Sequence, residues 1–222
     1  MAIDLQLRKT LKSGLRRFDL DVCLQSQAQR IVIHGPSGAG KSATLKLIAG
    51  LVQPDQGHIR VAGQTWFDSA EKINNKPQSR QLGYLFQDYA LFPHLTVRQN
   101  IGFGLTNRWT NPSTSVNDKR IDYWIKAFSL DGLEHQRPAD LSGGQRQRTA
   151  LARTLVTNPK LLLLDEPFAA LDIDLRAQLR QELDQLQRQL AIPMILITHD
   201  AQDIQAFGDE VYCMRDGVLT KP

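Results

Sequence analysis

The stretch that decides the fold reads Gly35-Pro36-Ser37-Gly38-Ala39-Gly40-Lys41-Ser42. It matches the pattern G-x-x-x-x-G-K-[ST] in full, after a strand-like run at residues 30–34 and before a helical pattern at residues 41–49. Glycines let such a loop curl until its backbone N–H groups point at phosphate oxygens, and the helix dipole adds to the attraction. Lys41 would reach the β- and γ-phosphates and Ser42 would bind Mg²⁺. A chance glycine turn is the alternative, expected at roughly the one-per-cent level.

Composition excludes several classes of protein. The chain has 222 residues, 27 Lys and Arg against 23 Asp and Glu, and 41% hydrophobic residues, which is ordinary globular usage. Two cysteines, Cys23 and Cys213, exclude a disulfide scaffold and a cysteine-rich zinc site. The formal charge of +4 is too small to require a nucleic-acid partner, and we expect none. Residues 1–10 lack a signal peptide and no apolar run is long enough to span a membrane, so we expect a cytoplasmic protein.

The pattern of short strands and helices predicts an α/β fold. Residues 3–7 and 18–24 alternate apolar and polar side chains, which predicts an antiparallel β edge near the N-terminus. Residues 161–164 and 195–198 are typical of fully buried strands, and the helix between them places five leucines on one face. This order predicts a P-loop NTPase with a mostly parallel central sheet and helices on both faces.

A small helical insert interrupts this alternation. Residues 106–116 are rich in Thr, Asn, Ser and Pro and predict a loop. After them, apolar side chains recur at i, i+3, i+4 and i+7, at Ile121, Trp124, Ile125 and Phe128. We therefore expect one domain over residues 1–222, with an α/β core at about 1–94 and 157–222 and a helical subdomain at about 95–156.

Two carboxylates end the apolar run of residues 161–164. Asp165 and Glu166 would face the phosphate loop, because ligands of open α/β sheets bind beyond the carboxyl ends of the strands. One carboxylate can orient Mg²⁺ and the next can polarise an attacking water. An acidic turn after an apolar strand is commonplace by itself, so the prediction depends on the phosphate loop upstream.

A second glycine motif, Leu141-Ser-Gly-Gly-Gln145, precedes another helical pattern, which runs from Arg146 to about Val156. Two glycines at a helix start form an anion site of the same physical kind. Since the first loop already surrounds a nucleotide's phosphates, a second site makes sense if it covers the nucleotide of another copy. A tight turn before a helix remains the alternative.

Together, the phosphate loop, residues 141–145, residues 165–166 and Thr198-His199-Asp200 resemble the nucleotide-binding subunit of an ATP-binding cassette (ABC) transporter. The resemblance covers essentially the whole chain. It implies a head-to-tail homodimer that holds two ATP molecules with Mg²⁺. Each ATP would contact residues 35–43 of one subunit, Ala43 included, and Ser142, Gly143, Gly144 and Gln145 of the other.

The resemblance also implies individual roles. His199 would contact the γ-phosphate, Gln87 would touch Mg²⁺ and couple to the membrane partner, and Ala170-Leu171-Asp172 would communicate between the two sites. Residue type alone would leave His199 an ordinary strand-end histidine and Gln87 a surface residue. The implied catalytic residues are Lys41, Gln87, Glu166 and His199, and the implied Mg²⁺ ligands are Ser42, Gln87 and Asp165.

One feature of the family is missing. These subunits usually stack adenine on an aromatic residue about two dozen positions before the phosphate loop, but residues 9–15 contain none. Phe18 is the nearest aromatic, and its alternation with Leu20 and Val22 favours a place in the core. We therefore expect aliphatic contacts to the base, and the preference for ATP over GTP stays open.

Residues 66–69 and 82–97 resemble importer subunits that work with solute-binding proteins, most of all the molybdate-importer ATPase. Sulfate, iron, polyamine and thiamine importers share much of this sequence. The resemblance implies transmembrane permease subunits as partners, received at an exposed aromatic patch at residues 89–94, and a peripheral position on the inner face of the membrane. The chain stops soon after Asp216-Gly217, so we expect no C-terminal regulatory domain.

Three other classes of nucleotide-binding protein fit the sequence less well. A soluble ABC protein of DNA repair or translation would carry long insertions or a second cassette, and 222 residues hold neither. A P-loop small-molecule kinase does not explain residues 141–145. A nucleotide-binding module without hydrolysis is disfavoured by Glu166 and His199.

Overall fold

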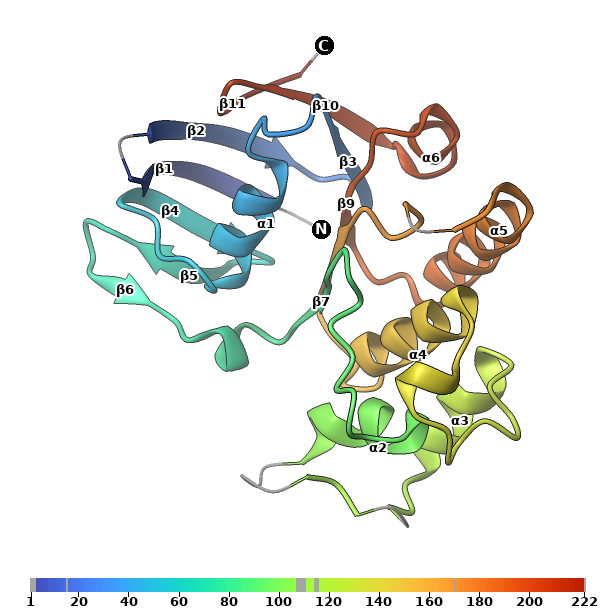
Figure 1. Ribbon diagram of the computed structural model, residues 1–222. Coiled ribbons are helices and arrows are strands. Elements are labelled where there is room, and N and C mark those ends of the chain that lie inside the picture. Colours follow the sequence, from blue (N-terminus) through green and yellow to red (C-terminus); the bar gives the residue numbers. More distant parts are fainter. Residues whose placement is uncertain (1–2, 15, 107–110, 114–115, 170, 222) are drawn as a thin grey trace.

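The computed structural model describes residues 3–14, 16–106, 111–113, 116–169 and 171–221. In this part of the chain the strands form one sheet of eleven, in the order β6-β5-β4-β1-β2-β11-β10-β3-β9-β8-β7 (Figure 1). The strands are β1 (Ile3–Ser13), β2 (Arg16–Ser26), β3 (Arg30–His34), β4 (Gln56–Val61), β5 (Gln64–Asp68), β6 (Ile73–Asn74), β7 (Leu82–Leu85), β8 (Leu161–Asp165), β9 (Met194–Ile197), β10 (Glu210–Arg215) and β11 (Val218–Thr220). The helices are α1 (Lys41–Ala49), α2 (Val97–Gly102), α3 (Lys119–Ala127), α4 (Gly143–Leu155), α5 (Ile173–Leu190) and α6 (Ala201–Phe207), with 3-10 turns η1 (Pro77–Arg80), η2 (Phe103–Leu105) and η3 (Pro138–Asp140).

The sheet has a parallel and an antiparallel part. Strands β10, β3, β9, β8 and β7 run parallel to one another. Strands β2, β1, β4, β5 and β6 pair antiparallel, so the antiparallel part is larger than the edge that the sequence predicted. Strand β11 joins the two parts, because it pairs antiparallel with β10 and parallel with β2.

The central strands β3, β9 and β8 are buried on both faces, which explains their almost unbroken apolar sequences. On β3, Ile31 and Ile33 pack into the core under α1, while Val32 packs into the core with α4 and α5. Strand β8 alternates in the same way, with Leu161 and Leu163 on the α1 side. The sheet is therefore held from both sides, and the loops at the carboxyl ends of its strands have a rigid base.

The segment predicted as a helical insert forms α2, α3 and α4, which lie together beside the β7 end of the sheet (Figure 1). Ile121, Trp124, Ile125 and Phe128 are buried there, as the 3.6-residue period predicted. Part of the predicted loop, residues 107–110 and 114–115, lies outside the described residues. No helix in the described ranges is both long and apolar enough to cross a membrane.

Candidate active site

The phosphate loop joins the end of β3 to the start of α1. Gly35, Gly38 and Gly40 have φ angles of 149°, 79° and 105°, in the region where side chains other than glycine are strained. A Cβ on Gly35 would lie 2.1 Å from the carbonyl oxygen of Met214, so this position also needs glycine for space. Helix α1 begins at Lys41 and ends before Gly50, as predicted.

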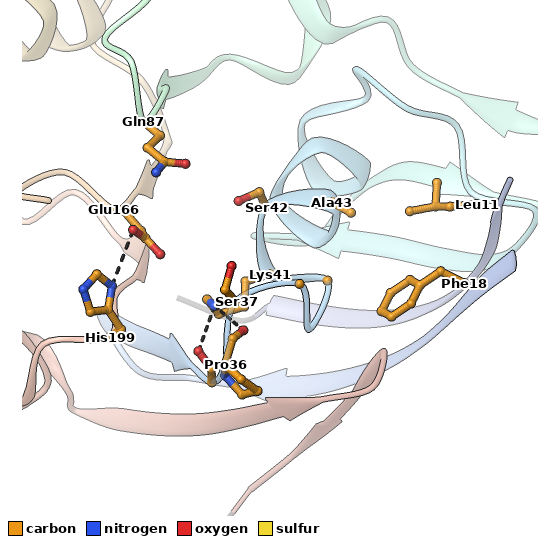
Figure 2. A pocket seen from close by; sticks show the side chains of 13 residues that line it. Leu11, Phe18, Pro36, Ser37, Lys41, Ser42, Ala43, Gln87, Glu166 and His199 are labelled. Atoms are coloured by element: carbon orange, nitrogen blue, oxygen red, sulfur yellow. Dashed lines mark hydrogen bonds and ion pairs between the residues drawn. The ribbon is translucent and has the colours of Figure 1, made fainter. Parts of the chain in front are cut away.

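The loop lines a cavity of about 700 Å³, within the range of small-molecule sites. Lys41 lies at its floor, where its Nζ donates to the carbonyl oxygens of Gly35 and Pro36 at 2.8 Å each (Figure 2). The cavity is lined by residues of the phosphate loop and α1 (Gly35, Pro36, Ser37, Gly38, Gly40, Lys41, Ser42, Ala43), by Leu11 and Phe18, and by Gln87, Glu166 and His199. The predicted residue Ala39 is buried beneath the loop instead.

Asp165 ends β8 behind the phosphate loop. Its Oδ1 accepts a hydrogen bond of 2.9 Å from the Ser42 hydroxyl, and its Oδ2 accepts one of 3.4 Å from the Tyr84 hydroxyl. Burial raises the pKa of Asp165, the charge of Glu166 adds to this rise, and the two hydrogen bonds oppose it. Burial and the neighbouring Asp165 likewise raise the pKa of Tyr84, which keeps the Tyr84 hydroxyl a donor. The carboxylate is thus held for an incoming cation.

Oxygen donors of the kind that Mg²⁺ prefers meet at this point. Ser42 and Gln87 line both the main cavity and an adjoining one of about 690 Å³, and Asp165 lines the adjoining one. Within the described residues, no three His, Cys, Asp or Glu side chains are placed so that they could hold a metal ion together. Magnesium is commonly held by one or two carboxylates plus substrate phosphates, so one carboxylate, one hydroxyl and one amide fit it.

Glu166 and His199 lie next to each other on one side of the cavity (Figure 2). The Nδ1 of His199 lies 3.5 Å from the Oε2 of Glu166, and the imidazole is 64% exposed. Glu166 has a φ of 47°, and its backbone N–H donates to the carbonyl oxygen of Ile197 on β9. Such left-handed backbone costs of order 1–3 kcal/mol and persists at functional sites where surrounding bonds enforce it. The strained turn directs the carboxylate into the cavity.

Phe18 corrects one expectation. It pairs directly with Leu11 across the β1–β2 hairpin, and it is half-buried instead of enclosed in the core. One side of Phe18 packs against the core, and the other lines the cavity with Leu11 (Figure 2). The two side chains lie across the loop from Glu166 and His199. The sequence alternation identified the core contact and missed the exposed side of the ring.

The second glycine motif does not line the phosphate-loop cavity. Ser142 caps α4: its hydroxyl accepts from the Gln145 N–H, and its own N–H donates to the Gln145 amide oxygen at 2.8 Å. The helix therefore begins at Gly143, three residues before the predicted start. Gly144 approaches α5 so closely that a Cβ would lie 2.6 Å from the Leu175 side chain. A ligand bound to the phosphate loop of the same chain would not contact the N–H groups at this helix start.

The predicted patch at residues 89–94 is only partly exposed. Tyr89 is buried, so it cannot belong to an exposed patch. Phe92 packs against Phe103 with ring centroids 4.2 Å apart, and the Arg153 guanidinium lies over Phe92. Arg153 also donates to the carbonyl oxygens of Tyr89 and Ala90, which fixes this loop on α4. Within residues 89–94, Ala90, Pro93 and His94 are exposed and Phe92 is half-buried, so the exposed aromatic surface is limited to His94, part of Phe92 and the neighbouring Phe103.

Comparison with known proteins identifies the family. The model of the family described as "ABC transporter" matches residues 19–169, which is more than half of the chain. The chain belongs to the ABC transporter family. The ABC match includes the phosphate loop, the Ser142 helix start and the Asp165–Glu166 pair, and it stops before His199.

Curated ABC relatives resemble the chain over most of its length. It is 42% identical over 206 residues to a spermidine/putrescine import ATP-binding protein of Nitratidesulfovibrio vulgaris, covering 93% of this chain and 53% of the relative. It is 43% identical to a sulfate/thiosulfate import ATP-binding protein of Synechocystis, covering 93% and 55%. A molybdate/tungstate import ATP-binding protein of Archaeoglobus fulgidus is 40% identical, covering 97% and 85%. The chain thus spans about half the length of the first two relatives.

The solved ABC structures confirm the α/β fold class. The dimeric cassette MJ0796, in a post-hydrolysis state bound to ADP and Pi, superimposes with a TM-score of 0.81 at 29% identity, covering 99% of this chain and 98% of the other. A second dimeric structure of MJ0796 gives the same TM-score. The predicted P-loop fold is therefore correct, with a more mixed sheet than expected.

Sequence reasoning missed two side chains of this ABC site. Tyr84 lies on β7, and nothing in the sequence around it indicates that its hydroxyl reaches Asp165. The sequence predicts aliphatic contacts to the base but does not indicate Leu11 in particular. A signal for Leu11 was available in the hairpin itself, since antiparallel pairing places it directly opposite Phe18. Ala170, of the predicted communicating loop, lies outside the described residues.

Proposed function

We propose that this chain is the ATP-hydrolysing subunit of an ABC importer and works as a head-to-tail homodimer. The observation that carries the proposal is the division of the site. The phosphate loop, Glu166 and His199 share one cavity, while the helix start at Ser142 does not line it. A second copy placed head to tail would bring its own Ser142, Gly143 and Gly144 over the nucleotide, and would receive the same contact in return.

The residues of the cavity suit phosphoryl transfer to water. Lys41 would exchange the carbonyl oxygens of Gly35 and Pro36 for phosphate oxygens. Glu166 would take a proton from the attacking water, and His199, within 3.5 Å of Glu166, would hold the γ-phosphate and that water in line. A bound Mg²⁺ ion, held by Ser42, Gln87 and Asp165, would neutralise charge on the transferring group. Loop N–H groups supply the remaining stabilisation.

Leu11 and Phe18 would contact the base of the nucleotide. They lie at the side of the phosphate loop away from Glu166, where the end of a bound nucleotide opposite its γ-phosphate would lie (Figure 2). An aromatic face and an aliphatic branch give apolar area and stacking, and they offer no hydrogen bond that separates adenine from guanine. Selection of ATP over GTP is therefore expected to be weak.

The proposal is tested first with Glu166→Gln. Loss of the general base is expected to lower kcat by roughly 10²–10⁴-fold, while ATP binding persists and the dimer accumulates in ATP. Turnover is measured by phosphate release and dimerisation by light scattering. Glu71→Gln is the matched control, because Glu71 is exposed and remote from the cavity. Unchanged turnover in Glu166→Gln would refute the assigned base.

The shared site is tested by mixing two inactive variants. Ser142→Arg blocks the helix start but leaves its own phosphate loop intact, and Glu166→Gln does the reverse. A mixed dimer then contains one complete site, so an equimolar mixture should recover about a quarter of wild-type activity, since half of the dimers are mixed. Ser142→Ala controls for the lost helix cap, worth about 0.5–2 kcal/mol. No recovery on mixing would exclude the head-to-tail arrangement.

We propose molybdate or a related oxyanion as the solute, with separate transmembrane subunits and a solute-binding protein as partners. The partly exposed Phe92 and Phe103 would receive a membrane subunit and hold the chain at the inner face of the membrane. The test uses the chain assembled with its membrane subunits in liposomes. Stimulation of ATPase activity by solute-loaded binding protein with molybdate or tungstate supports the proposal, and stimulation only by sulfate or spermidine refutes it.

A further inference from the structure

A polar cluster fills the space between α5 and the segment that carries His199. Most of its members, though not Arg180, line a small hollow together with Glu166, Phe168 and His199. Its charged and hydroxyl members are Arg176 and Arg180 on α5, Thr198 and Asp200 beside His199, and Asp203 on α6. None of these residues lines the nucleotide cavity, so the proposed chemistry leaves them without a role.

Within the cluster, Arg180 anchors the base of the segment. Its Nε donates to the buried Asp203 at 2.7 Å, and the other oxygen of Asp203 accepts from the Thr198 hydroxyl at 2.7 Å. Asp203 and Thr198 are only 2% and 3% exposed. The Thr198 oxygen in turn accepts the backbone N–H of Asp200 at 3.0 Å. The two residues on either side of His199, Thr198 and Asp200, are thus held by hydrogen bonds to buried groups.

Arg176 differs from Arg180 because it joins two separate segments. Its Nη1 donates to the Asp200 carboxylate at 3.1 Å, and its Nη2 donates to the carbonyl oxygen of Leu171 at 3.0 Å. Burial alone would raise the pKa of Asp200, but the Gln202 N–H and the Arg176 and Arg180 guanidinium groups lower it overall. Asp200 is therefore ionised at neutral pH, and one planar guanidinium spans a carboxylate and a carbonyl.

The Leu171 end of this bridge touches the start of α4. A Cβ on Gly143 would lie 3.8 Å from the Leu171 side chain, and Leu175, one residue before Arg176, packs against Gly144. Gly143 and Gly144 belong to the helix start that the proposed dimer places over the partner's nucleotide. A short chain of contacts therefore leads from His199 in one site to the surface that covers the other.

From this geometry we infer that Arg176 is a positioning residue. It couples the position of His199 to the position of the backbone at Leu171. The inference rests on the proposed function. When the partner's nucleotide shifts Gly143 and Leu171, the bridge transmits the shift to Asp200 and its neighbour His199. Because Arg176 does not line the cavity, it should affect turnover and leave the affinity of the isolated chain for nucleotide unchanged.

The first test is Arg176→Gln. The expected result is a fall in kcat of about tenfold or more, since small displacements of a catalytic group are costly, with the Kd for ATP of the monomer changed less than about twofold. Arg188→Gln is the matched control, because Arg188 lies on the same helix and its ion pair with Asp184 is exposed. Wild-type kcat in Arg176→Gln would overturn the inference, and so would a Kd raised as much as kcat falls.

A double-mutant cycle separates positioning from a general structural role. Asp200→Asn keeps an oxygen to cap the Gln202 N–H but loses the charge that faces Arg176. If the bridge acts through Asp200, the double variant should be no slower than the slower single variant. Multiplicative losses in kcat would overturn the inference. Arg176→Lys replaces the planar two-pronged guanidinium with a single ammonium group, so it should hold Asp200 and Leu171 less firmly and also lose kcat; if Arg176→Gln does not fold, wild-type kcat in Arg176→Lys decides against the bridge.

Failure of this inference differs from failure of the proposed function. An inactive wild-type chain, or active Glu166→Gln, contradicts the ATPase assignment itself. An active wild-type chain with inactive Glu166→Gln and fully active Arg176→Gln leaves that assignment intact and removes only the bridge.

Discussion

Replacing Arg80 with methionine should destabilise the fold through the helix that follows the phosphate loop. Arg80 is 1% exposed and ends η1 beneath the C-terminus of α1. Its guanidinium donates to the carbonyl oxygens of Ile48 at 2.6 Å, Leu47 at 3.2 Å and Asn75 at 3.0 Å. The Arg80 guanidinium leaves no room for a side chain at position 50, because a Cβ on Gly50 would lie 2.6 Å from the guanidinium carbon. Arg80 therefore caps the helix from the side.

The magnitude follows from the partners that Arg80 would leave behind. The Leu47 oxygen would keep the Gly50 N–H as a donor, whereas the hydrogen bonds of Arg80 to Ile48 and Asn75 would be lost. Each buried unpaired carbonyl costs about 1–3 kcal/mol, and the lost charge at the helix C-terminus about 0.3–1 kcal/mol. Burial lowers the pKa of Arg80 to about 10, so removal of the charge recovers part of its desolvation cost. A net loss of about 2–4 kcal/mol follows, which lowers Tm by roughly 4–16 °C at this chain length.

Thermal unfolding followed by circular dichroism measures this loss. Arg215→Met, at an exposed position, is the control and should shift Tm by less than about 2 °C. Melts with ATP should show the same nucleotide-induced rise in Arg80→Met as in the wild type, because Arg80 lies at the end of α1 away from the phosphate loop. A Tm for Arg80→Met within about 2 °C of the wild type would show that the helix does not depend on this cap.

Three further outcomes are expected from single substitutions. Phe18→Ala should weaken ATP and GTP binding alike by about 2–10-fold in calorimetry, since only stacking is lost; a loss confined to one nucleotide contradicts the assigned contact. Asp165→Asn should raise the Tm of the nucleotide-free protein at pH 8 but not at pH 4, because the raised pKa of Asp165 means that its ionised form disfavours the fold above that pKa; equal gains at both pH values contradict this cause. Gly144→Ala should be about 1 kcal/mol less stable than Gly143→Ala in denaturant titrations, because both gain helix propensity and only at Gly144 would an added Cβ lie within 2.6 Å of Leu175; equal effects would exclude the packing explanation.

Local sequence signals predicted much of the fold. The bounds of α1 were correct because glycines on both sides of it fix where a helix can start and stop. The leucine face of α5 was correct in direction, with Leu179 and Leu183 buried and the outer leucines partly covered. The start of α4 was placed too late, although Ser142 and Gln145 form a capping box that the sequence displays.

Contacts between distant segments could not be predicted in this way. The hydrogen bond from Tyr84 to Asp165 joins residues 81 positions apart, and it depends on how β7 and β8 align in the sheet. The half-exposure of Phe18 depends on the phosphate loop, which passes so close at Gly40 that a Cβ there would lie 3.1 Å from the Phe18 ring. The alternation of apolar and polar residues along a strand predicts which face of the sheet a side chain lies on. Whether another segment covers that face depends on the folded chain. For the same reason, the bridge made by Arg176 has no local signal.

The polar groups of the phosphate site are already paired with one another. Lys41 donates to two carbonyl oxygens of its own loop, and the Ser42 hydroxyl donates to Asp165. A nucleotide with its cation would therefore exchange these bonds for new ones, so these two side chains add less net affinity than their number of contacts suggests. By contrast, the glycine N–H groups of the loop are not hydrogen-bonded to Lys41 or Ser42. Leu11 and Phe18 offer apolar surface, which has no hydrogen bond to exchange. Affinity should then arise mainly from loop N–H groups and base contacts, while Lys41 and Ser42 act most strongly as charge develops in the transition state.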